Sequence, residues 1–180
     1  MEYFLLVNEL VKKQNAVLQI SLTAIMSALV MVGTLIVRIP NMMGGYFNVG
    51  DVMIFVTALT FGPFVGGVSG GLGSALADLM GGYVVFALPT FIIKGLEGLI
   101  AGLITNKKRI FRDVLAVIFA GVEMITGYFL VELYLYGIGG AIGEVLANIG
   151  QIAVGGLIGI PVALILRRRL PEILKNSTNV

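Results

Sequence analysis

The sequence contains no cysteine and no histidine among its 180 residues. Without cysteine, the chain has no disulfide framework and no thiolate metal site. Without histidine, it lacks the commonest protein ligand for metals and the usual catalytic base. We therefore expect no metal site, and the two absences argue against an enzyme.

Charge is also scarce, because only 12% of the residues are charged, whereas a soluble domain carries about 25%. Hydrophobic residues make up 58% of the chain, and the mean hydropathy is +1.01. Such a chain could not cover a water-facing surface, so we expect an all-α integral membrane protein. The net charge of +2 is small and argues against nucleic acid as a partner.

The apolar stretches predict one membrane domain over residues 1–180 with six transmembrane helices. A span needs about 20 mostly apolar residues. The expected spans are 16–37, 51–61, 64–80, 86–104, 114–136 and 141–166. The second is too short to cross alone. The segment before Lys12 is too short and mixed for a cleavable signal, so we expect the first span to follow it.

Basic residues orient these spans. They cluster at Lys12–Lys13, at 107–112 and at Arg167–Arg169. Because basic loops stay in the cytoplasm, successive clusters must be separated by an even number of crossings. The proposed spans give four crossings and then two. The sequence therefore predicts that both termini are cytoplasmic.

Small residues recur every four positions from just before the third span into it, at Gly62, Gly66, Gly70 and Ser74. In a membrane helix this spacing lets two backbones approach closely. A nucleotide-binding loop is the alternative, but the Gly-Lys-Ser/Thr ending of such a loop is missing. We therefore expect helix packing, and no ATP site in this chain.

Lys94 and Glu97 lie inside the apolar fourth span. Near the middle of a bilayer each charge costs about 2.5–3.5 kcal/mol. Three residues apart on a helix, they share one face and can pair. Two interpretations stay open: a structural ion pair that locks the bundle, or groups that contact a ligand.

Polar residues on three helices converge in the outer half of the expected bundle, as a small-molecule pocket requires. The candidate ligand contacts there are Thr90, Lys94, Glu97, Glu123, Tyr128, Asn148 and Gln151. Glu123 could instead be the partner of Lys94 or a proton site. Asn148 and Gln151 could simply bridge helices, and Tyr128 could belong to an aromatic belt. We expect Glu132 and Glu144 at the outer interface, as solvated carboxylates.

The connection 38–50 is long and glycine-rich for a simple loop between spans. Asn41, Tyr46 and Asn48 offer hydrogen-bonding groups in it. Because it lies on the outside, above the polar residues, it could act as a lid over the pocket, and the alternative is an ordinary outer loop.

Several segments resemble a known family. Tyr46–Asp51, Phe61–Gly67 and Gly73–Asp78 look like the second and third helices of the substrate-binding S-components of energy-coupling factor (ECF) vitamin transporters. The segment 92–102 looks like the fourth. Within that family, these segments look most like the hydroxymethylpyrimidine or pyridoxine type, with the riboflavin type next.

The resemblance implies a subunit that binds a water-soluble vitamin near the outer face, in a prokaryotic cell membrane. It implies partners as well, namely a transmembrane T-subunit and two ATPase subunits that use ATP, so this chain would bind no cofactor. The family's Ala-x-x-x-Ala motif, which docks on the T-subunit, is matched here by Ala24 and Ala28. A stand-alone proton-coupled secondary transporter of a small metabolite is the alternative, with Glu97 or Glu123 as the proton site.

Overall fold

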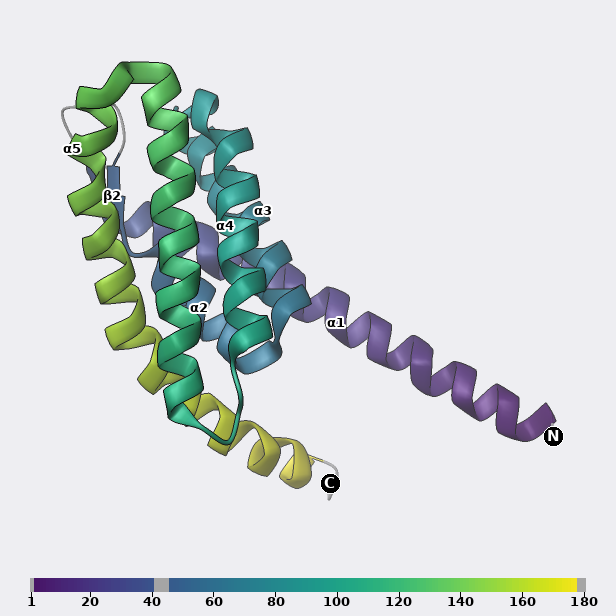
Figure 1. The fold of residues 1–180 in the computed structure, drawn as a ribbon. Helices are drawn as coiled ribbons and strands as arrows, with labels where there is room; N and C mark the ends of the chain where they lie inside the picture. The colour runs from purple at the N-terminus through teal and green to yellow at the C-terminus, as the bar shows by residue number, and fades with distance from the viewer. Residues whose placement is uncertain (1, 41–45, 178–180) are drawn as a thin grey trace.

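The computed structural model describes residues 2–40 and 46–177, which are almost entirely helical. The helices are α1 (Glu2–Ile36), α2 (Gly50–Phe61), α3 (Pro63–Gly81), α4 (Val84–Ile104) and α5 (Ile110–Ser177), as Figure 1 shows. Two short strands, β1 (Arg38–Pro40) and β2 (Tyr46–Asn48), pair antiparallel between α1 and α2. The predicted all-α membrane class is therefore confirmed, apart from this small ribbon.

A glycine divides α5 into two arms. Gly137 has φ 75° and ψ −176°, which lies outside the helical region, and glycine tolerates a positive φ because it has no Cβ. The chain turns near this point, so that residues 110–136 and 138–177 run side by side in opposite directions (Figure 1). With the arms taken separately, the described residues form six helical segments. The two arms contain the predicted spans 114–136 and 141–166, and the second arm continues beyond residue 166. That each arm crosses a membrane once stays a prediction.

Helix length and hydropathy also fit a membrane protein. Among the described residues, three helical stretches are long and apolar enough to cross a bilayer: Ala16–Ile36, Val84–Ile104 and Ile110–Leu170. The last of these contains both arms of α5. Helix α2 has 12 residues, which confirms that the second segment is short.

The first helix differs from its predicted range. It begins at Glu2 rather than at residue 16, and its N-terminal part extends away from the bundle (Figure 1). No proline interrupts Glu2–Ile36, and Lys12–Lys13 can end an apolar span without ending a helix. Hydropathy therefore identified the apolar part of the helix, Ala16–Ile36, but not the residue at which the helix begins.

Helices α3 and α4 pack closely through their glycines. A methyl group on Gly66 would lie 2.6 Å from the Ala58 Cα atom and 2.9 Å from the Gly98 carbonyl oxygen. A methyl group on Gly71 would lie 2.7 Å from the Phe91 carbonyl oxygen. Residues 66–73 are continuous helix, so the packing interpretation of these glycines is confirmed and the nucleotide loop is excluded.

A buried ion pair joins four segments at one end of the bundle. The Arg167 guanidinium pairs with Asp113 at 2.7 Å, and donates to the Leu59 carbonyl oxygen and to the Thr105 hydroxyl, both at 2.9 Å. The basic clusters 107–112 and 167–169 therefore lie at the same end, opposite the turn at Gly137 (Figure 1). This arrangement agrees with the predicted placement of both clusters on one side of the membrane.

Candidate ligand-binding site

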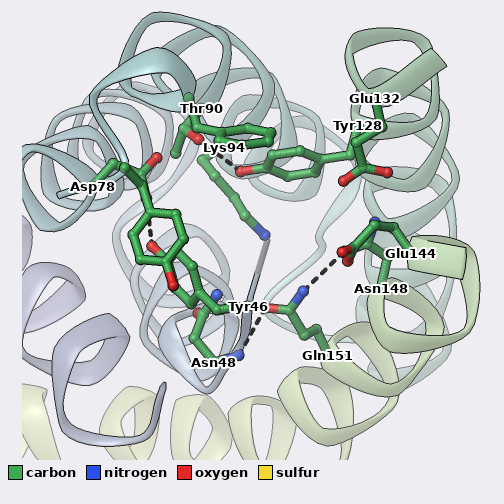
Figure 2. Close-up of a pocket in the computed structure, with 12 residues that line it drawn as sticks. Tyr46, Asn48, Asp78, Thr90, Lys94, Tyr128, Glu132, Glu144, Asn148 and Gln151 are labelled. Carbon is green, nitrogen blue, oxygen red and sulfur yellow. Dashed lines mark hydrogen bonds between the residues drawn. The ribbon is translucent and has the colours of Figure 1, made fainter. Parts of the chain in front are cut away.

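A cavity lies at the end of the bundle away from the basic clusters, between β2, the end of α3, the first half of α4 and both arms of α5 (Figure 2). It holds about 380 Å³ of empty space, including its open mouth. Its lining consists of polar and aromatic side chains: Tyr46, Asn48, Asp78, Tyr83, Phe86, Thr90, Lys94, Tyr128, Glu132, Glu144, Asn148 and Gln151.

Most residues predicted to contact a ligand line this one cavity: Tyr46, Asn48, Thr90, Lys94, Tyr128, Asn148 and Gln151. Asn41 falls outside the described residues. Glu97 is fully buried and Glu123 is half-buried, and neither lines the cavity. Whether a ligand touches any of these residues stays a prediction.

Lys94 is the centre of a buried charge cluster. Its ammonium group pairs with Asp51 and, at 2.9 Å, with Glu97. Asp51 comes from the first turn of α2, where the helix dipole favours a negative charge. The ammonium group also points into the cavity, as Figure 2 shows. The predicted ion pair is thus confirmed, Asp51 rather than Glu123 is the second partner, and Lys94 also lines the cavity.

One wall of the cavity is aromatic and hydrogen-bonded. The Tyr46 hydroxyl donates to Asp78, which ties β2 to the end of α3. The Arg38 guanidinium lies 4.6 Å from the centre of the Tyr46 ring, and the Tyr46 and Tyr83 rings are 4.6 Å apart. Such stacking holds aromatic side chains rigid. These contacts join Arg38, Tyr46, Asp78 and Tyr83 into one wall.

Two hydrogen-bonded links hold the other walls. Thr90 on α4 and Tyr128 on α5 share a hydrogen bond of 3.0 Å. Gln151 accepts from the Asn48 backbone N–H at 3.2 Å and donates to Asn148 at 2.9 Å. Gln151 therefore connects β2 to the second arm of α5, so it does bridge elements, and it also lines the cavity.

The expectation that Glu132 and Glu144 are solvated is wrong. Each is only 3% exposed and lines the cavity. The second arm of α5 folds back from Gly137 and carries Glu144 to the same cavity that Glu132 reaches from the first arm (Figure 2). The sequence could have indicated this position. Glu132 follows Tyr128 by four residues and Glu144 precedes Asn148 by four, so each shares a helix face with a predicted ligand contact.

Asp78, Tyr83 and Phe86 also line the cavity, although sequence reasoning did not select them. Asp78 continues the four-residue repeat of small residues along α3, which gave a signal that it faces another element. No comparable signal marks Tyr83 and Phe86. Within residues 2–40 and 46–177, no group of three or more acidic side chains could hold a metal ion.

Comparison with known proteins decides the family. Residues 14–168 match the sequence model of the family described as "ECF-type riboflavin transporter, S component". The chain belongs to this S-component family. It is therefore part of a transporter rather than an enzyme, and it is a multi-pass protein of a prokaryotic membrane. The predicted family is confirmed.

Two relatives of this S-component illustrate the range of similarity. It is 45% identical to a Pyrococcus woesei chain named "Uncharacterized protein in gap 3′region", over 81% of this chain and 99% of the relative. It is 34% identical to the "Thiamine precursor transporter HmpT" of Lactococcus lactis subsp. cremoris, over 65% of this chain and 67% of the relative. The matched family and the name of the Lactococcus relative support a role in the uptake of a vitamin or its precursor.

Proposed function

We propose that this chain is the high-affinity substrate-binding subunit of an ECF-type importer for a water-soluble vitamin or vitamin precursor. The observation that carries the proposal is the cavity lined by polar and aromatic residues, at the end of an apolar bundle away from its basic clusters. Polar groups and aromatic rings that converge inside an otherwise apolar bundle suit a small polar heterocycle.

The substrate type that we favour is hydroxymethylpyrimidine or pyridoxine, with riboflavin next. The name of the Lactococcus relative supports a thiamine precursor, and the matched family supports riboflavin. The cavity offers carboxylate and amide acceptors together with a lysine donor. A ring that carries amino and hydroxyl groups can use both kinds of partner.

We place six spans in the membrane, with both termini in the cytoplasm. Three features support this topology: the helical segments, the break at Gly137, and the two basic clusters held at one end by Arg167. In this orientation the cavity opens towards the outside, where a substrate-binding subunit meets its ligand.

The T-subunit would dock on α1 through Ala24 and Ala28. Both are exposed, whereas Ser27 and Val30 on the other side of α1 pack against Gly73. Two alanines four residues apart leave a smooth groove that another helix can approach closely. Two ATPase subunits would complete the importer and use the ATP, and this chain itself would hold no cofactor.

Proteoliposomes test the proposal. With the T-subunit and ATPases present, we expect ATP-dependent uptake of radiolabelled hydroxymethylpyrimidine, pyridoxine or riboflavin, and none with this chain alone. Uptake by the chain alone under a proton gradient would contradict the proposal and favour a secondary transporter.

A paired variant tests docking. Ala24→Leu/Ala28→Leu should abolish ATP-dependent uptake while ligand binding in detergent stays unchanged, because the bulky side chains fill the groove. Ala153→Leu, at an exposed position of α5, is the control and should preserve uptake. Full uptake by the double variant would show that docking lies elsewhere.

A further inference from the structure

Glu132 has a buried acceptor atom that the protein leaves unused. Its side chain is 3% exposed and lines the cavity. The Oε2 atom is buried and has no hydrogen-bond partner among the described residues. A buried acceptor without a donor is costly, and such exceptions call for a physical reason.

Four donors near the cavity are held by other partners. The Lys94 ammonium pairs with Asp51 and Glu97. The Tyr46 hydroxyl donates to Asp78, and the Gln151 amide donates to Asn148. Arg38 stacks on the Tyr46 ring and donates to the Ala77 carbonyl oxygen. The partners of these four groups are thus other than Glu132.

The cavity also carries an excess of negative charge. Its acidic lining residues are Asp78, Glu132 and Glu144, and its basic lining residue is Lys94. Burial disfavours an uncompensated carboxylate, and the Glu132 and Glu144 carboxylates repel each other electrostatically. A ligand that brings N–H donors or positive charge to this side removes both penalties. A ligand that brings a carbonyl oxygen there adds to them.

We propose that Glu132, next to Glu144, recognises an exocyclic amino group on a heteroaromatic ligand. The ligand's ring would lie between the Tyr46–Tyr83 wall and the α5 side, with its amino edge directed to Glu132 (Figure 2). Glu132 and Glu144 on α5 would then determine ligand specificity. Their carboxylate acceptors would select aminopyrimidine-like ligands over rings of the same size that carry a carbonyl group. The inference rests on the proposed vitamin-binding function.

The test uses two probes that differ in the group at position 4 of the ring. They are 4-amino-5-hydroxymethyl-2-methylpyrimidine and its 4-oxo counterpart, in which a carbonyl acceptor replaces the exocyclic amino donor and a ring nitrogen carries the proton. Isothermal titration of the purified full chain in detergent should give affinity for the amino compound about tenfold or more above the 4-oxo compound, because the exocyclic carbonyl oxygen would face the Glu132 carboxylate with no donor between them.

Glu132→Gln should reduce this preference to about threefold or less, because the amide can donate to the carbonyl as well as accept. Tyr134→Phe is the matched control. It removes a polar group from an exposed side chain on the same arm of α5 that does not line the cavity, so the preference should stay as in the wild type. The ratio of the two affinities is insensitive to a general loss of folded protein.

The possible outcomes separate the two proposals. An unchanged preference in Glu132→Gln would overturn the inference. Binding of riboflavin with neither pyrimidine bound would overturn it too, but would leave the S-component function intact. Failure of ATP-dependent vitamin uptake with the partner subunits would instead overturn the proposed function.

Discussion

The two ends of this bundle each bury a charge cluster, and the clusters differ in how completely they are satisfied. At the basic end, Arg167 pairs with Asp113 and donates to Leu59 and Thr105. At the cavity end, Lys94 pairs with Asp51 and Glu97, but Asp51 Oδ2 and Glu97 Oε1 have no hydrogen-bond partner in the described part of the chain.

The difference teaches how to tell a structural charge from one held for a ligand. Burial alone does not separate them, because both clusters are buried. A charge cluster whose polar atoms all have partners, and which borders no cavity, serves to join helices, as the cluster around Arg167 does. A cluster that lines a cavity and keeps unused acceptors is poised for a further partner.

The largest effect is expected at the cavity end. Lys94→Met should weaken binding of the ligand by about a hundredfold or more, because it removes a donor that lines the cavity and leaves Asp51 and Glu97 buried behind it without their partner. Isothermal titration on protein that elutes as a single folded species checks this. Unchanged affinity in a folded variant would rule out a binding role for Lys94.

A substitution at the basic end should lower the stability of the protein and leave ligand binding unchanged. Arg167→Met should lower the free energy of unfolding by about 3–5 kcal/mol, because it leaves Asp113 buried without its partner. Ligand affinity of the folded fraction should stay unchanged. Arg168→Met, at an exposed position, is the control and should alter neither quantity. A loss of affinity in Arg167→Met would show that the two ends are coupled.

These clusters also show how far the sequence could reach. The helical segments were predictable because Gly62–Pro63 and the basic clusters interrupt long apolar runs. Close packing by α3 was predictable because small residues recur every four positions, although the helix that it meets was not. The faces that carry Thr90, Lys94, Asn148 and Gln151 followed from helical periodicity.

The neighbours across helices could not be predicted in the same way. Periodicity gives the face of a residue but not the helix that it meets, so Asp51 was missed as the second partner of Lys94. Depth along a helix placed Glu132 and Glu144 at the outer end, but it could not show that the turn at Gly137 brings both to one cavity. Both contacts depend on how far each helix is shifted along its neighbour, which is decided where the helices pack through their glycines.

A smaller effect is expected at the link between β2 and α5. Gln151→Leu leaves the Asn48 backbone N–H without its acceptor and should cost about 1–3 kcal/mol. If the link positions Tyr46 and Asn48 on the cavity wall, affinity should fall by about tenfold. Titration of the purified variant checks this, and an affinity equal to that of the wild type would show that the wall forms without Gln151.

The smallest effects concern the glycine framework between the two ends. Gly66→Ala should destabilise the protein by about 1–3 kcal/mol, because the added methyl group would overlap the backbone of α2. Gly95→Ala is the matched variant, since its nearest contact would be an ordinary 3.5 Å. Its stability should stay equal or rise slightly. Thermal unfolding in detergent distinguishes them, and equal loss in both would contradict the packing argument.

The most direct test of the central claim, that the cavity around Lys94 holds a vitamin-like ligand, is mass spectrometry of the small molecules released when the purified protein is denatured. We expect a heteroaromatic compound that copurifies with the wild type and with Tyr134→Phe, and that is lost from folded Lys94→Met. A compound retained equally by Lys94→Met would contradict it.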